Sequence, residues 1–116
     1  MIEKVAQQRR FPRVGIKVPV RYQMRGYPQI GNTLSEDISI QGVRMLGERY
    51  VVPETALDLQ INLKAHVIRV TGKIAWSNVI PRSDRHHMGI EFLEVEPEER
   101  VYLANFIRNH IRNSRG

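Results

Sequence analysis

The sequence of 116 residues contains no cysteine, which excludes disulfide bonds, cysteine-ligated zinc and thiol catalysis. The missing cysteines fit a reducing compartment, and we expect a cytoplasmic protein. No apolar run approaches the roughly 20 residues that a membrane-spanning helix needs, and the first residues lack the apolar segment of a signal peptide. The length fits a single domain with a core of its own.

The sequence also lacks the residue patterns of an enzyme or a metal site. It contains no nucleophile–base set, no paired-acid motif and no glycine loop of the kind that holds phosphates. His86 and His87 are adjacent on a predicted strand, so their side chains point to opposite faces and cannot ligate one metal ion. We therefore expect a binding protein without catalytic activity and without a cofactor.

Positive charge is concentrated at one end of the chain. Residues 1–26 contain seven basic residues and one acidic residue, whereas the remaining 90 residues contain eleven of each, so this segment accounts for the whole net charge of +6. A basic segment on a neutral body indicates a local site for an anion, because diffuse binding to polyanions is typical of proteins that are basic all over.

Alternation of apolar and polar residues predicts β-strands through the middle of the chain. Pro19 has no N–H to donate, so its strand is expected at an edge or with that position unpaired. Gly72 interrupts another strand and predicts a bulge or a bend. Trp76 shares the apolar face of the same run, which favours a place in the core. The strand candidates lie within residues 17–24, 42–46, 57–63, 68–76 and 88–92.

The last part of the sequence has helical periodicity. Apolar residues recur at helical spacing from Leu103 to Ile111, and Pro97 suits the first turn, so we predict a helix from about residue 97 to 113. Six or so short strands followed by one helix predict a mainly β fold, an antiparallel barrel that is closed or nearly closed, with the helix packed against it.

Three arginines lie within five residues before the first predicted strand. Arg9, Arg10 and Arg13 surround Pro12, which stiffens the segment. Guanidinium groups form paired hydrogen bonds with phosphate oxygens and with the O6/N7 edge of guanine. A solvated basic tail explains the same composition, and Arg10 fits either a phosphate contact or a solvated neighbour.

A second cluster contains Asp37, Ser39 and Gly42. The Asp37 carboxylate can accept hydrogen bonds from the N1–H and N2–H₂ groups of guanine, and Ser39 adds a hydroxyl. Gly42 allows the chain to turn with a positive φ or to approach a ligand closely. An ordinary turn between strands uses the same three residue types, so this explanation stays open.

The two clusters together, Arg9-x-x-x-Arg13 and Asp37-x-Ser39-x-x-Gly42, resemble the two-part signature of the PilZ family, whose members are bacterial receptors for cyclic di-GMP. The resemblance implies a six-stranded antiparallel barrel with an N-terminal arm that folds over the ligand. It implies that Arg9 and Arg13 hold guanine edges and phosphates, that Asp37 and Ser39 hold a guanine, and that Gly42 shapes the turn.

The resemblance extends along most of the chain, since residues 72–76 and 89–92 look like later strands of such domains and the predicted helix falls where the family has one. We therefore expect a flexible arm over residues 1–13 and a barrel domain over residues 14–116. The arm has few apolar groups, so we expect it to become ordered only when the ligand neutralises its arginines.

The leading hypothesis is a cyclic di-GMP receptor that signals to a separate, unidentified partner protein. One alternative is a PilZ-like interaction module that works without a ligand. Another is a nucleic-acid-binding barrel, which the basic arm favours. Aromatic residues make up only 7% of the chain, too few for an exposed ladder on which bases stack, so we expect no nucleic-acid partner.

Overall fold

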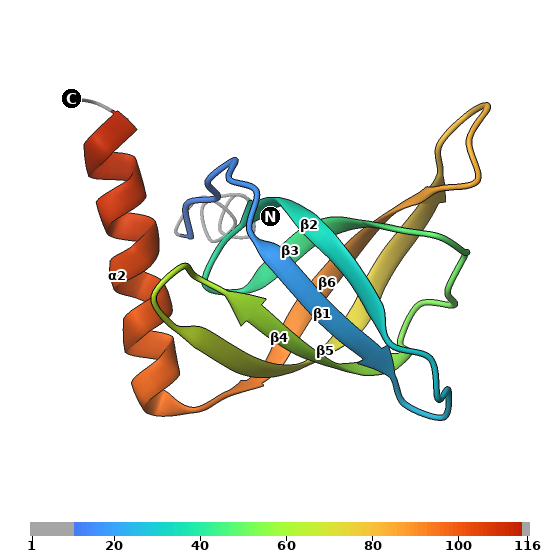
Figure 1. The fold of residues 1–116 in the computed structure, drawn as a ribbon, viewed down its shortest axis with the longest axis horizontal. Helices are drawn as coiled ribbons and strands as arrows, with labels where there is room; N and C mark the ends of the chain where they lie inside the picture. The colour runs from blue at the N-terminus through green and yellow to red at the C-terminus, as the bar shows by residue number, and fades with distance from the viewer. Residues whose placement is uncertain (1–10, 115–116) are drawn as a thin grey trace, which may run out of the picture.

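The computed structural model describes residues 11–114, which form a six-stranded antiparallel barrel with one helix beside it (Figure 1). The strand order is β1-β2-β3-β6-β5-β4, and β4 pairs back with β1 to close the barrel. The predicted mainly β fold is confirmed. The elements are β1 (Pro19–Met24), β2 (Gly31–Ile38), β3 (Gly42–Gly47), β4 (Ala56–Asn62), β5 (Val67–Val79), β6 (His86–Val95) and α2 (Pro97–Ser114).

The apolar faces of the strands fill the barrel. The predicted alternation between Leu57 and Leu63 is confirmed, since all four apolar side chains of this run are at most 1% exposed. The predicted C-terminal helix is confirmed too, and it extends to Ser114. In Figure 1, α2 stands against the β4–β5 connection, and it buries Leu103 and Ile107 in the core.

Pro19 is the first residue of β1, which has a neighbour on each side and is therefore not the edge strand that was one of the two expectations; the other, an unpaired position at Pro19, holds on the side of β4. Pairing of β1 with β4 begins only at Val20, opposite Ile61. The first position of a strand tolerates proline, because the N–H that proline lacks is not needed there.

Strand β2 is the element that the apolar pattern did not predict. Its inward Ser35 is polar and buried, and after the register shift between Ser35 and Asp37 the buried Asp37 lies on the outer face, opposite Arg44. The Ser35 hydroxyl accepts the N–H of Val18 at 2.9 Å and donates to the carbonyl of Ile16 at 2.6 Å. Buried polar groups are stable where such partners exist, so the strand needs no apolar stripe here, and Asp37 lies in a strand and not in a turn.

Two irregularities in the β5–β6 pairing decide where side chains point. One lies between Thr71 and Gly72, where the predicted irregularity is present, but the extra residue, Leu93, belongs to the partner strand β6. The other lies between Ile74 and Trp76, where β5 contains one residue more than β6. An extra residue reverses the alternation beyond it, so Trp76 is 38% exposed on the outer surface, and the prediction of a core position is wrong.

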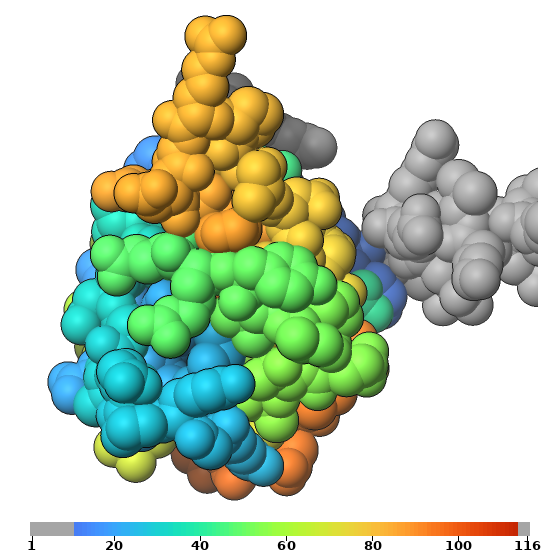
Figure 2. Space-filling model, turned by 90° about the vertical axis from the view of Figure 1, so that its right-hand side faces the viewer, coloured from blue at the N-terminus to red at the C-terminus, as the bar shows by residue number. Residues whose placement is uncertain are grey.

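The end of the barrel away from α2 is hollowed (Figure 2). The hollow has a volume of about 350 Å³, and Tyr22, Met24 and Met88 contribute to its lining. Burial raises the pKa of the Tyr22 phenol above its usual value, and the negative charge of Glu48 adds to this effect. No helix within residues 11–114 has the length and apolar character needed to span a bilayer.

Candidate ligand-binding site

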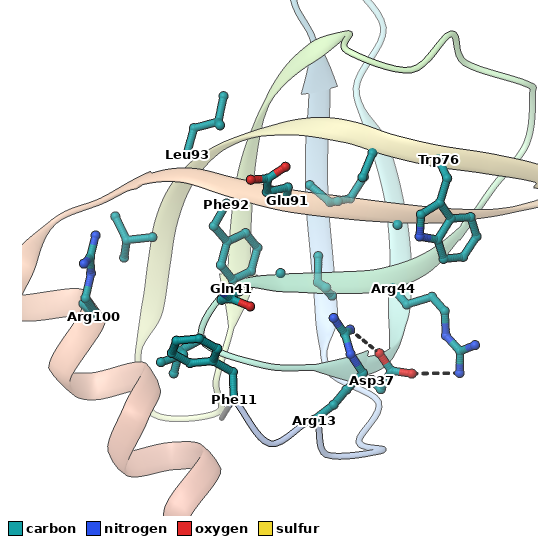
Figure 3. Close-up of a pocket in the computed structure, with 17 residues that line it drawn as sticks. Phe11, Arg13, Asp37, Gln41, Arg44, Trp76, Glu91, Phe92, Leu93 and Arg100 are labelled. Atoms are coloured by element: carbon teal, nitrogen blue, oxygen red, sulfur yellow. Dashed lines mark hydrogen bonds and ion pairs between the residues drawn. The ribbon is translucent and has the colours of Figure 1, made fainter. Parts of the chain in front are cut away.

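A groove of about 670 Å³ lies on the outer surface of the barrel, beside the start of the described chain (Figure 3). Residues from the segment before β1, from the β2–β3 turn and from the outer face of β5 and β6 surround it. The charged, amide and aromatic side chains that line it include Arg13, Asp37, Gln41, Arg44, Trp76 and Glu91.

Asp37 lies between two guanidinium groups. Its Oδ1 is 2.6 Å from Nη1 of Arg13, and its Oδ2 is 2.7 Å from Nη2 of Arg44 (Figure 3). The Asp37 side chain is only 11% exposed, whereas each arginine side chain is nearly half exposed. Charge-assisted hydrogen bonds of this length are among the stronger polar contacts in proteins, so the carboxylate is held in one orientation with both oxygens occupied.

Backbone pairing brings these residues together. Val14 and Ile38 exchange two hydrogen bonds of 2.9 Å, and Arg13 and Asp37 directly precede them. Arg44 sits opposite Asp37 in the β2–β3 register, a position where side chains of opposite charge attract each other across strands. Two segments 24 residues apart in sequence therefore meet at one carboxylate.

A second carboxylate extends the cluster. Oε1 of Glu36 is 3.8 Å from Nε of Arg44 and 2.9 Å from Nδ1 of His87. His87 therefore pairs with a carboxylate, and residues 11–114 contain no group of three or more metal-ligating side chains. Arginine and carboxylate groups alternate along this row, which crosses β2, β3 and β6.

The structure places Ser39 beneath the groove and not in its lining. Ser39 is 2% exposed, its hydroxyl accepts the N–H of Gln41 at 3.1 Å, and its own N–H donates to the carbonyl of Gly42. These bonds close the tight connection between β2 and β3. Ser39 therefore fixes the turn that carries Gln41 to the rim of the groove.

Gly42 lines the groove, but it does not have the positive φ that was one of the two predicted reasons for a glycine. A Cβ at this position would be 2.2 Å from the carbonyl oxygen of Ile90, which belongs to the backbone of β6. The close approach is thus between two strands of the barrel. Glycine is required here because β3 and β6 could not otherwise pair.

Two residues of the groove were missed as site candidates. Arg44 follows Gly42 by two positions and faces outward. Its place beside Asp37 could be predicted only if β2 were known to be the partner strand of β3. The apolar pattern predicts a core position for Trp76, because a bulge leaves no trace in that pattern. Arg9 and Arg10 lie outside residues 11–114, so their contacts stay predictions.

The sequence profile of the PilZ domain matches residues 7–109. This chain belongs to the PilZ domain family. A comparison with curated proteins found no match in sequence. The fold is also similar to that of solved structures that share no more than 20% sequence identity with this chain, so these similarities concern the fold alone.

The inhibitor of motility MotI/DgrA of Bacillus subtilis is similar to this PilZ domain, with a TM-score of 0.73 and 20% identity over 88% of this chain and 51% of that one. The present chain therefore spans about half of its length. The PilZ domain of YcgR from Escherichia coli, solved with c-di-GMP, has a TM-score of 0.70 and 14% identity; the match covers 94% of this chain and 95% of that one. PlzA of Borreliella burgdorferi, in complex with c-di-GMP, has a TM-score of 0.58 and 11% identity; the match covers 97% of this chain and 56% of that one.

Proposed function

We propose that this PilZ domain is a receptor for cyclic di-GMP and binds it in the groove around Asp37. The observation that carries the proposal is the arrangement of Asp37 between Arg13 and Arg44, with the exposed indole of Trp76 lining the same groove. Cyclic di-GMP is a dianion with two guanines, so it offers a donor edge to a carboxylate, phosphates to guanidinium groups and ring faces to an indole. The cyclic di-GMP in the YcgR and PlzA structures supports this choice of ligand.

In the proposed complex, Arg9, Arg10 and Arg13 bind phosphates and the O6/N7 edge of guanine. Asp37 accepts the N1–H and N2–H₂ groups of a guanine, which requires that its present contact with Arg13 is exchanged for the ligand. Ser39 and Gly42 support the site from below, by holding the turn and the close pairing of β3 with β6.

Selectivity for guanine follows from this use of Asp37. Adenine presents an acceptor where guanine presents N1–H, so a bound adenine would leave buried polar groups without partners. Isothermal titration calorimetry of the purified protein tests the proposal directly. We expect cyclic di-GMP to bind with a dissociation constant in the micromolar range or better, about 8 kcal/mol of binding free energy, and cyclic di-AMP far more weakly.

Equal affinity for both dinucleotides would contradict the assigned role of Asp37. A folded protein that binds neither would contradict the receptor proposal, and it would favour an interaction module that works without a ligand. Circular dichroism of the same sample establishes that the protein is folded.

We propose further that residues 1–13 fold over the bound ligand and that this step creates a surface for a partner protein. The arm contains few apolar residues, which bury little surface, so neutralisation of its arginines by a dianion is the driving force. We propose that the domain acts through this partner and has no catalytic role. Hydrogen exchange tests the folding step: amides of residues 5–12 should become protected when cyclic di-GMP binds, while those of β4 are protected throughout. Equal protection of residues 5–12 with and without ligand would contradict it.

A further inference from the structure

We infer that Arg44 is a further ligand-contacting residue of the groove, that it binds a phosphate of the dinucleotide, and that Glu36 and His87 position it. The inference rests on the proposed function, because it concerns the same groove. Arg44 is not part of the arginine motif of the arm, since it belongs to strand β3 of the barrel.

The side chain of Arg44 is available to a ligand. It lines the groove, it is 45% exposed, and within residues 11–114 it forms ion pairs only with Asp37 and Glu36. These contacts engage Nη2 and Nε, and a guanidinium has five N–H donors. The remaining donors, including both of Nη1, can bind a phosphate oxygen while the contact with Glu36 persists.

Arg44 balances negative charge beside the groove. Asp37 and Glu36 place two negative charges close to the groove. Arg13 and Arg44, which form ion pairs with them, carry two positive charges that balance these. Without Arg44 the cluster would present an excess of negative charge to a dianionic ligand. Opposite charges attract each other at such distances near a protein surface, so this cation favours the ligand independently of the arm.

Glu36 and His87 hold the guanidinium in place. Oε1 of Glu36 is 2.9 Å from Nδ1 of His87 and 3.8 Å from Nε of Arg44, so the carboxylate lies between the ring and the guanidinium. The three residues come from adjacent strands, β2, β3 and β6, which are rigid supports. An arginine that is already oriented loses less side-chain entropy when the ligand binds.

Titration of cyclic di-GMP into the parent protein, Arg44→Ala and Arg44→Lys tests the contact. We expect Arg44→Ala to raise the dissociation constant about tenfold or more, the usual effect of losing a hydrogen bond to a charged group. Arg44→Lys keeps the charge but not the planar fork, so it should recover part of the affinity. Arg108→Ala is the matched control, because Arg108 is exposed on α2 and donates to the nearby Asn105, and it should bind like the parent.

An Arg44→Ala protein that binds as tightly as the parent, or more tightly, would overturn the inference, because Arg44 would then merely neutralise Asp37. A parent protein that does not bind at all would instead contradict the proposed function. Melting temperatures of all variants establish that a loss of affinity is not a loss of folding.

A double-mutant cycle tests the positioning role. Glu36→Gln removes the positioning contact and also a negative charge near the dianion, and only the first effect depends on Arg44. We therefore expect the effect of Glu36→Gln on the dissociation constant to be about threefold less favourable in the parent than in the Arg44→Ala background, and the same for His87→Ala. An equal effect of Glu36→Gln in both backgrounds would overturn the assignment of Glu36 as a positioning residue.

Discussion

The indole of Trp76 lies directly across Gly89 on the outer surface of the barrel. The two residues are opposite each other in the β5–β6 register, and a Cβ at Gly89 would be 2.2 Å from Nε1 of the indole. An aromatic ring that covers a cross-strand glycine is a stabilising pair in sheets. The same contact fixes the orientation in which the ring faces the groove.

Gly89→Ala should therefore displace the indole and weaken ligand binding without unfolding the barrel. Trp76 is the only tryptophan of the chain, so its fluorescence reports on this position alone. We expect a changed emission maximum and a higher dissociation constant for cyclic di-GMP. Gly15→Ala is the control, since its Cβ would meet no atom nearer than 3.9 Å. Unchanged emission from Gly89→Ala would show that the ring does not depend on the glycine.

Gly42→Ala should destabilise the barrel more than Gly89→Ala does. Its Cβ would meet the backbone carbonyl of Ile90 at 2.2 Å, and backbone cannot rotate away as a side chain can. We expect a loss of about 2–3 kcal/mol in the free energy of unfolding, in the range of severe steric substitutions, measured by urea denaturation. A variant as stable as the parent, with reduced ligand affinity, would instead make Gly42 a direct ligand contact.

Arg13→Ala should lose affinity without losing stability. We expect weaker binding of cyclic di-GMP by roughly 1–3 kcal/mol, the value of a paired guanine contact, and the same range for Arg9→Ala. The Arg13 side chain is half exposed, and Asp37 keeps its ion pair with Arg44 when Arg13 is removed, so the melting temperature should stay close to that of the parent. Arg25→Ala removes an ion pair with Asp58 in which both side chains are exposed, away from the groove, and should change neither property. An early-melting Arg13→Ala that binds normally would make this arginine structural.

Ser35→Ala should destabilise the protein by about 1–3 kcal/mol, because a buried N–H of Val18 and a carbonyl of Ile16 would lose their partner. Thermal denaturation measures the effect. Ser83→Ala provides the comparison, since the Ser83 hydroxyl accepts a hydrogen bond in an exposed loop, where water replaces it. Equal melting temperatures for Ser35→Ala and the parent would mean that water satisfies the Val18 amide as well.

Tyr22 should make stability depend on alkaline pH. Burial, with the charge of Glu48, raises the pKa of the phenol in the folded protein above the ordinary value of 10.0. The folded state then holds this proton more tightly than the unfolded state, so the contribution is complete below pH 10.0 and is lost as the pH rises through the folded pKa. The free energy of unfolding of Tyr22→Phe should fall less steeply with pH in this window. Parallel slopes for the two proteins would contradict the raised pKa.

Much of the barrel could be predicted because its strands bury one apolar face. The alternation from Leu57 to Leu63 needs no knowledge of the neighbouring strands, and the helical spacing after Pro97 is equally local. Strand β2 could not be found in this way. Its buried polar residues, the inward Ser35 and the outward Asp37, are stabilised by partners from segments distant in sequence, and those partners become visible only in the folded chain.

The candidate site was predictable to the extent that its residues form a sequence motif. Arg13, Asp37 and Gly42 line one groove, and their contacts with a ligand stay predictions. Arg44 and Trp76 could not be predicted as residues of the groove. The position of Arg44 depends on the register between β2 and β3, and the direction of the Trp76 side chain depends on a bulge in β5.

The double hydrogen bond between Val14 and Ile38 has a kinetic consequence for the proposed receptor. It fixes the backbone on both sides of the Arg13–Asp37 contact, so the arginine can leave the carboxylate only by rotation of its side chain. Rotations of exposed side chains take nanoseconds or less, whereas terminal segments move more slowly. The contact between Arg13 and Asp37 therefore opens without delay, and in the proposed receptor it is not the step that limits the speed of the response.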